Sequence, residues 1–237
     1  MIKLKGFEKS LYVEKNLILD LIDSSVKEET PMHMSIIDAV VLNRALKDEK
    51  YNKLLNSFDE LLCDSSLIVF LYNWIYNKKI KGFNGPDLFK VLVHEKKYNQ
   101  LIIGTTQEMF NEVKNKSSNK NLFYLDIGFK NNWKDFNYEL IESYVLSNNI
   151  NILWVMLGNP KQDYVSKKLK DRGLINSVVF SSGAAYLFYL DSIKNSTIEI
   201  KGLKFLWLRR ILQNPRRQLI RSLEVLKNIK KFINLFK

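Results

Sequence analysis

Short runs of apolar residues alternate with longer amphipathic segments through the second half of the chain. Apolar runs at residues 100–104, 121–128, 150–157 and 176–183 predict strands, and apolar spacing of three or four predicts helices over 106–116, 136–149 and 161–173. This alternation is typical of a parallel sheet with helices on both faces, so we expect an α/β, Rossmann-like fold. The unbroken apolar run 152–157 agrees, because a parallel strand is buried on both sides.

The first third of the chain and its last segment read differently. Residues 35–57 predict two helices, and residues 58–70 predict a strand, a polar turn and the start of a helix. In the loop 82–89, Gly85 and Pro86 are expected to end one element and Asp87 to cap the next. The character changes near Ser192, which predicts a core over 1–191 and a basic helical appendage over 192–237.

The appendage carries most of the net charge. Residues 201–237 hold eleven lysines and arginines against Glu224 alone, or +10 of the formal +12. An apolar stripe recurs there every three or four positions, at Leu219, Leu223, Leu226, Ile229, Ile233 and Phe236. Basic residues on the other faces, among them Arg221 and Lys227, make this pattern typical of a helix in an anionic membrane interface.

Composition limits the class of protein. A chain of 237 residues with 46% hydrophobic content can bury one sizeable core. The single cysteine, Cys63, excludes an intrachain disulfide, and two histidines are too few for a histidine-rich metal site. The N-terminal ten residues do not resemble a secretory signal, and the apolar stretch 61–76 is interrupted by Asp64 and two serines. We therefore expect a cytoplasmic protein without a transmembrane segment, and core positions for Trp74, Trp133 and Trp154.

The predicted strand ends hold the candidate chemistry, because ligands bind at the carboxyl edge of a parallel sheet. After the strand 150–157, Gly158 and Pro160 precede a helix whose first residues are Lys161 and Gln162. Pro160 suits the first helical position, and a helix N-terminus favours an anion. Small or hydroxyl residues follow two other strands and are candidates for close approach to a ligand or for capping: Gly104, Thr105, Thr106, Gly183 and Ala184.

Five sequence blocks then resemble one family. The block "GNPKQDYV" (158–165) is similar to the G-x-P-K-Q-E signature of the bacterial WecG/TagA/CpsF glycosyltransferases. Four further blocks, at 55–70, 82–89, 181–196 and 202–218, resemble family segments in the same order. The resemblance covers about residues 35–220. It implies transfer of a hexose or an N-acetylhexosamine from a UDP-sugar to a polyprenyl-diphosphate-linked sugar, with inversion, by a peripheral protein at the inner face of the plasma membrane.

The resemblance also assigns roles to residues. Asp64 matches the family's proposed catalytic aspartate, which would take the acceptor's proton. Its position alone favours a cap on the helix that begins at Ser65 or Ser66, and the resemblance favours the base. No Asp-x-Asp motif is present to hold a metal, so we expect no metal or other cofactor, and positive charge must stabilise the leaving diphosphate. Arg210, Arg216 and Arg217 stand where the family has its tail arginines, although anionic lipid would attract them too. Four further residues are candidates for substrate binding. Ser35 and Asp38 are the possible stand-ins for a Thr-Pro-Asn-like stretch that the family has before its first long helix, and Gly85 and Asp87 stand in the block 82–89.

Two other functions remain open. Leu187 stands where the family has an aspartate, which would fit a member that binds UDP without turnover. A basic-tailed nucleic-acid-binding protein is the other alternative. The apolar stripe of the appendage favours a membrane surface over nucleic acid, and the sequence leaves a homo-oligomer possible.

Overall fold

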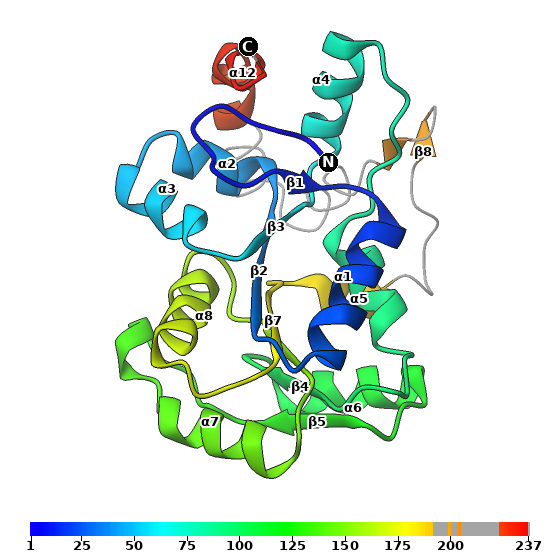
Figure 1. The fold of residues 1–237 in the computed structure, drawn as a ribbon, viewed down its shortest axis with the longest axis vertical. Helices are drawn as coiled ribbons and strands as arrows, with labels where there is room; N and C mark the ends of the chain where they lie inside the picture. Colours follow the sequence, from blue (N-terminus) through cyan, green and yellow to red (C-terminus); the bar gives the residue numbers. More distant parts are fainter. Residues whose placement is uncertain (192–198, 201–202, 205–222, 237) are drawn as a thin grey trace.

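The computed structural model describes residues 1–191, 199–200, 203–204 and 223–236, which form an α/β fold around one sheet (Figure 1). The strand order is β1-β3-β2-β7-β6-β4-β5, and all neighbouring strands run parallel. The strands are β1 (Leu11–Tyr12), β2 (Met32–Ile37), β3 (Glu60–Cys63), β4 (Gln100–Ile103), β5 (Leu122–Leu125), β6 (Ile152–Val155) and β7 (Val178–Ser181). A separate antiparallel pair consists of β8 (Glu199–Ile200) and β9 (Leu203–Lys204).

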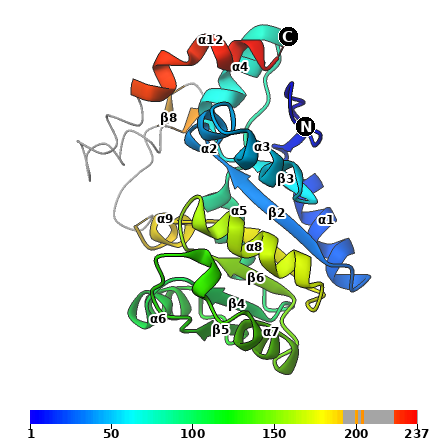
Figure 2. The same cartoon turned by 90° about the vertical axis from the view of Figure 1, so that its left-hand side faces the viewer.

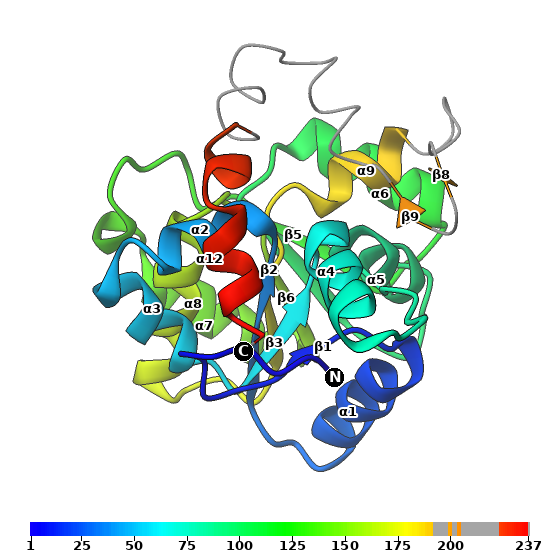
Figure 3. The same ribbon diagram turned by 90° about the horizontal axis from the view of Figure 1, so that it is seen from above.

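Helices cover both faces of the sheet (Figure 2). One face packs on α1 (Lys15–Lys27), α5 (Gly85–Leu92), α6 (Gln107–Ser117) and α9 (Ala185–Asp191), around the stacked rings of Trp154 and Phe180. The other face packs on α7 (Tyr138–Ser147) and α8 (Lys161–Arg172), with the short 3-10 helix η1 (Trp133–Asp135) beside them. A third cluster, around β3 and the N-terminal segment, includes α2 (Ala39–Ala45), α3 (Glu49–Asn56), α4 (Ser66–Tyr76) and α12 (Ile229–Asn234), seen from above in Figure 3.

The predicted α/β fold is confirmed. The four apolar runs are β4, β5, β6 and β7, and the three amphipathic segments are α6, α7 and α8. The strand and helix predicted over 58–70 are β3 and the beginning of α4. Each strand is shorter than its apolar run, because the run continues into the turn at the carboxyl edge.

The sequence reading missed the central strand β2. It placed residues 35–37 in a helix, whereas the two helices of that region begin only at Ala39 and Glu49. The segment Met32–Ile37 is buried along its whole length, yet it contains His33 and Ser35. These two polar residues interrupt the apolar pattern by which a buried strand is recognised.

Two helix starts also differ from prediction. Helix α5 begins at Gly85 and is capped by Asn84, whose side-chain oxygen accepts a hydrogen bond from the backbone N–H of Asp87 at 2.9 Å. Asp87 is therefore in the first turn and is not the cap. Pro160 lies one position before α8, at its N-cap, and not at the first helical position.

The described part of the predicted appendage packs on the core. Val225, Phe232, Leu235 and Phe236 are buried in the cluster around β3. The backbone N–H of Lys5 donates to the carbonyl oxygen of Leu235 at 2.8 Å. The apolar stripe is thus divided: its C-terminal half packs inside the protein, whereas Leu223 and Leu226 are exposed. Leu219 lies outside the described residues.

Candidate functional site

The carboxyl edge of the sheet brings together residues that are far apart in the sequence. Ile37 of β2 pairs with Cys63 of β3, so Asp38 and Asp64 follow two adjacent strands. Ser182 follows β7, which lies on the other side of β2. Strands in a sheet are about 4.8 Å apart, so Asp64 and Ser182 are separated along the edge by about 10 Å.

Asp64 is held at this edge by backbone on two sides. Its own N–H donates to the carbonyl oxygen of Ile37 at 2.8 Å, and its Oδ1 accepts from the N–H of Gly85 at 3.0 Å. The cap of α4 is Ser65, whose hydroxyl accepts from the N–H of Ile68. Asp64 is therefore not the cap of α4, and its carboxylate instead accepts the N–H of the first residue of α5. A partly exposed carboxylate with a fixed orientation is left at the edge.

The glycine at position 85 is required by this arrangement. A Cβ on Gly85 would lie 2.9 Å from Cγ2 of Ile36 and 3.7 Å from the carboxyl carbon of Asp64. The clash is with Ile36, whereas 3.7 Å to Asp64 is an ordinary contact; without a side chain, α5 can begin against Ile36 and beside Asp64. The predicted substrate residue Asp87 lies in the first turn of the same helix.

The two predicted substrate residues in and directly after β2, Ser35 and Asp38, have different environments. Asp38 caps α2, where its Oδ1 accepts hydrogen bonds from Val40 N–H at 2.9 Å and Val41 N–H at 2.8 Å. Ser35 is fully buried, and its hydroxyl donates to Oδ1 of Asp163 at 3.0 Å. Ser35 thus makes a structural contact to Asp163, and its role in substrate binding stays a prediction.

A buried hydrogen-bond network fixes the beginning of α8. Oδ2 of Asp163 accepts from the Tyr51 hydroxyl at 2.7 Å and from the side-chain amide of Asn159. Together with the bond from Ser35, these contacts connect β2, α3 and the loop before α8 to the carboxylate of Asp163, which is fully buried. Burial raises the pKa of Asp163 to about 6, while the hydrogen bonds from Tyr51 and Ser35 act in the opposite direction.

Three buried polar atoms at the carboxyl edge have no hydrogen-bond partner, two of them beside the end of β7 and one after β4, two strands further along the sheet. They are Oε1 of Gln162, the hydroxyl oxygen of Ser182 and the hydroxyl oxygen of Thr105. The other end of the Gln162 amide donates to the carbonyl oxygen of Ser181 at 3.2 Å, so the side chain is anchored on the last residue of β7. Buried polar atoms are nearly always paired, and three orphans along one sheet edge indicate a site for a polar ligand.

Two glycines border these atoms for different reasons. Gly183 has φ +56°, and a Cβ there would lie 3.2 Å from Oε1 of Gln162, so a side chain would crowd the orphan oxygen. Ala184 follows it and is exposed. Gly104 has φ +82°, and its Cβ would lie 2.8 Å from the Leu157 side chain. Both the positive φ and the Leu157 side chain therefore require glycine at position 104, and its approach to a ligand stays a prediction.

The rim of the site is aromatic and basic. Lys161, the first residue of α8, places its ammonium nitrogen 4.8 Å from the ring centroid of Phe129 and donates to the carbonyl oxygen of Lys130. The Phe129 side chain is 86% exposed. Gly158, in the turn before α8, has φ +76°. A Cβ at this position would have no atom within 4 Å, so the space around it is empty of protein.

The family model for WecG/TagA/CpsF glycosyl transferases matches residues 10–237. The chain belongs to this family. No curated protein sequence matches the chain. As a member of the WecG/TagA/CpsF family, the protein is a glycosyltransferase with an α/β fold.

The family signature corresponds to the loop and helix start around Asp163. Of the other predicted catalytic residues, Arg210, Arg216 and Arg217 lie outside the described residues, so this structure gives them no position. Within the described ranges, no cluster of three or more histidine, cysteine or acidic side chains is arranged to hold a metal ion. None of the helices in the described part is long and apolar enough to cross a membrane.

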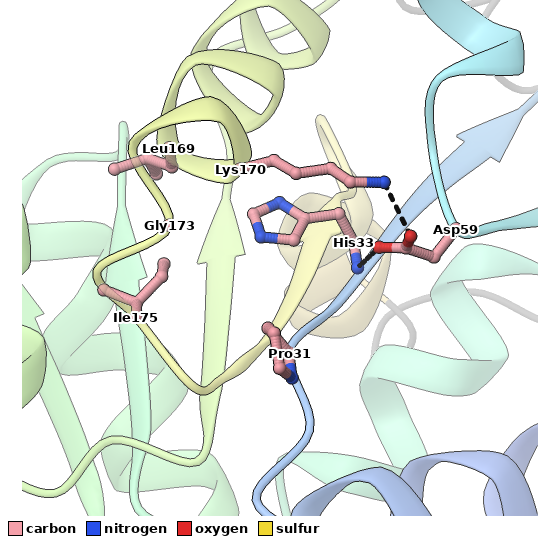
Figure 4. Close-up of a pocket in the computed structure, with 7 residues that line it drawn as sticks. All are labelled: Pro31, His33, Asp59, Leu169, Lys170, Gly173 and Ile175. Atoms are coloured by element: carbon pink, nitrogen blue, oxygen red, sulfur yellow. Dashed lines mark hydrogen bonds and ion pairs between the residues drawn. The ribbon is translucent and has the colours of Figure 1, made fainter.

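A pocket at the opposite, amino edge of the sheet is separate from this site (Figure 4). It encloses about 200 Å³ and is lined by Pro31, His33, Asp59, Leu169, Lys170, Gly173 and Ile175. The Asp59 carboxylate accepts a hydrogen bond from the backbone N–H of His33 at 2.8 Å. It also pairs with the Lys170 ammonium at 2.6 Å, so these two opposite charges neutralise each other. Burial lowers the pKa of His33 to about 4, which keeps it neutral near pH 7.

Sequence reasoning missed Tyr51, Asn159, Asp163 and Ser182. One signal was available, since Gln162, Val165, Ser166 and Leu169 recur at helical spacing on the buried face of α8. Polar residues on a buried helix face must have partners. Gln162 and Ser166 bond to Ser181 of β7, whereas the partners of the buried Asp163 on β2 and α3 are over a hundred residues away and could not be identified from the pattern.

Proposed function

We propose that this WecG/TagA/CpsF family member is an inverting, metal-independent glycosyltransferase. It transfers a hexose or an N-acetylhexosamine from a UDP-sugar to a polyprenyl-diphosphate-linked sugar in the synthesis of a cell-surface polymer. The observation that carries the proposal is the placement of Asp64 on the same sheet edge as the unpaired polar atoms of Gln162, Ser182 and Thr105. A base and a polar binding surface are the two parts that such a transfer requires.

In the reaction, the acceptor hydroxyl oxygen attacks the anomeric carbon of the sugar and forms the new C–O bond. The bond from that carbon to the diphosphate oxygen breaks, and UDP leaves with the electron pair. Asp64 receives the hydroxyl proton, and its bond from the Gly85 N–H fixes the carboxylate for this role. Attack from the face opposite the leaving group inverts the anomeric centre.

The unpaired atoms suit the donor. Oε1 of Gln162 can accept a hydrogen bond from a uracil N–H or a sugar hydroxyl, and the Ser182 and Thr105 hydroxyls can donate to or accept from the donor. The exposed ring of Phe129 and the ammonium of Lys161 offer a surface for a base and its phosphates. We propose that the departing diphosphate is bound by Arg210, Arg216 and Arg217, because guanidinium groups bind phosphate oxygens bidentately.

The decisive experiment changes the base alone. In Asp64→Asn we expect UDP affinity and melting temperature to be kept while turnover falls by roughly 100- to 10,000-fold, as for a positioned general base. Donors are first identified by a thermal-shift screen of UDP-sugars, since a ligand that binds the folded state raises its stability. Asp171→Asn, an exposed carboxylate at the far end of α8, is the matched control. Near-wild-type turnover in Asp64→Asn would remove Asp64 as the base, and UDP binding without turnover in the wild type would identify a binding-only member.

A further inference from the structure

Helix α4 exposes a face that its composition would normally bury. Its eleven residues, Ser66–Tyr76, include none with a charged side chain. Ile68, Val69 and Leu71 pack on the core, but Phe70 is 48% and Trp74 66% exposed. A helix that is apolar all round is usually buried, and neighbouring exposed aromatic residues mark an interaction surface. The prediction that Trp74 is a core residue is therefore wrong.

The exposed aromatic residues adjoin a basic segment. Three exposed lysines follow the helix directly, Lys78, Lys79 and Lys81, and residues 65–86 contain no acidic residue. We name the exposed side chains of Phe70, Trp74 and Tyr76 with these three lysines the α4 patch.

The C-terminal helical segment lies beside α4 at the same end of the molecule (Figures 1 and 3). The ring of Phe236 contacts the rings of Tyr72 and Tyr76, at centroid distances of 6.2 and 6.4 Å. This segment contributes more exposed side chains of the same two kinds, Leu223, Leu226, Lys227 and Lys230, and its one acidic residue, Glu224, pairs with Lys47 at 3.6 Å. Apolar and basic exposed residues therefore gather on two adjacent elements.

We propose that the α4 patch binds the surface of an anionic lipid membrane. Tryptophan and phenylalanine partition into the interfacial region, and adjacent lysines are attracted to anionic headgroups. The charge argues against a second copy of the chain as the occupant. A two-fold contact through this patch would gather two sets of three lysines in one interface, and residues 65–86 contain no acidic residue to offset them.

This surface would place the reaction next to the membrane, a consequence that rests on the proposed function. Asp64 directly precedes Ser65, the cap of α4, and Trp74 lies ten residues further along the chain. At a rise of 1.5 Å per residue, the candidate base is about 15 Å from the membrane anchor. A sugar carried on a lipid diphosphate is confined to that zone.

The test measures co-sedimentation of the full chain with vesicles of equimolar phosphatidylcholine and phosphatidylglycerol. Phe70→Ser with Trp74→Ser should weaken partitioning at least about tenfold, because two apolar side chains no longer enter the interface. Lys78→Gln with Lys79→Gln and Lys81→Gln should weaken it by roughly 100-fold, and pure phosphatidylcholine vesicles should bind little protein.

Matched controls remove similar groups elsewhere. Leu146→Ser with Leu174→Ser deletes two exposed leucines from the opposite end, and Lys27→Gln with Lys96→Gln and Lys120→Gln deletes three exposed lysines. Both controls should partition as the wild type does. Equal losses in the controls and in the patch variants would overturn the proposal. So would unchanged pelleting of the patch variants, or a patch-dependent dimer in sedimentation velocity without vesicle binding.

A site-specific probe checks insertion directly. Cys63 is buried, and burial raises the pKa of its thiol to about 12, so a cysteine introduced at position 74 is labelled selectively. A polarity-sensitive dye there should shift to shorter wavelength with anionic vesicles, whereas the same dye at position 174 should not. Absence of a shift at position 74 would contradict insertion. UDP-sugar binding by thermal shift, measured without lipid, should be equal in all patch variants, so a failure of this proposal is distinguishable from a failure of the proposed function.

Discussion

Gln162 illustrates how one side chain can be both fixed and available. Its amide nitrogen donates to the Ser181 carbonyl oxygen, and its amide oxygen is buried without a partner beside Gly183. The desolvation of that oxygen has already occurred in the free protein. A ligand N–H or O–H that reaches it gains a hydrogen bond without this cost, which favours binding.

We therefore expect Gln162→Ala to raise the Michaelis constant for the donor by roughly 10-fold, the worth of one hydrogen bond of about 1.5 kcal/mol. Turnover at saturating donor should change far less. Steady-state kinetics with the donor found by the screen provide the measurement. Gln107→Ala, on an exposed position of α6, is the control. A loss confined to turnover would assign Gln162 to the chemical step.

At the scale of elements, α12 closes the cluster around β3. Phe232 is fully buried, Leu235 and Phe236 are nearly so, and the Tyr76 hydroxyl of α4 donates to the Phe236 carbonyl oxygen. The helix is thus part of the fold, although its sequence resembles that of an interfacial helix. Its remaining exposed residues, with α4, form the surface proposed to meet lipid.

Truncation after Leu226 should consequently destabilise the protein. Three large apolar side chains leave the core, each worth about 1.5–3 kcal/mol, and 1 kcal/mol corresponds to roughly 2–4 °C for a chain of this size. We expect the melting temperature to fall by at least about 10 °C. Leu223→Ser with Leu226→Ser, which changes only exposed residues, should leave it within about 2 °C. An unchanged melting temperature after truncation would show that α12 does not contribute to the core.

At the scale of the whole molecule, two buried titratable groups on opposite sheet edges have opposite effects on how stability depends on pH. The pKa of His33 is lowered to about 4, so between its ordinary value of 6.5 and 4 the unfolded chain binds the proton first and stability falls as pH falls. The pKa of Asp163 is raised from 3.8 to about 6, so the folded chain retains its proton longer and stability falls as pH rises across that interval. Each effect has a ceiling of about 3 kcal/mol, and between pH 4 and 6 they largely cancel.

Replacing one of these two groups should reveal how the other makes the free energy of unfolding depend on pH. Relative to wild type, Asp163→Asn should gain stability as the pH rises from 4 to 6, and His33→Gln should lose stability over the same range. Urea unfolding at several pH values provides the free energies, and the difference from wild type removes the contribution of the other carboxylates. His94→Gln is a control for a histidine outside the buried pocket. Difference curves that stay flat for both variants would contradict the shifted pKa values of both groups.

The sequence by itself determined much of the fold, because hydrophobic periodicity is a local property. Apolar runs gave β4 to β7 and amphipathic spacing gave the helices between them, and the family blocks indicated Asp64 and the loop before α8. The polar strand β2 was missed because His33 and Ser35 have partners that are remote in sequence.

Only the tertiary structure decided which side chains lie against protein and which are exposed. It packs Asp163 against Ser35 and Leu157 against Gly104, two positions that the sequence offered as ligand contacts. Trp74 read as core and is exposed, whereas Phe236 read as interfacial and is buried. A pattern of apolar and polar residues states what a side chain requires from its surroundings. Which surface satisfies that requirement depends on elements that meet only when the whole chain is folded.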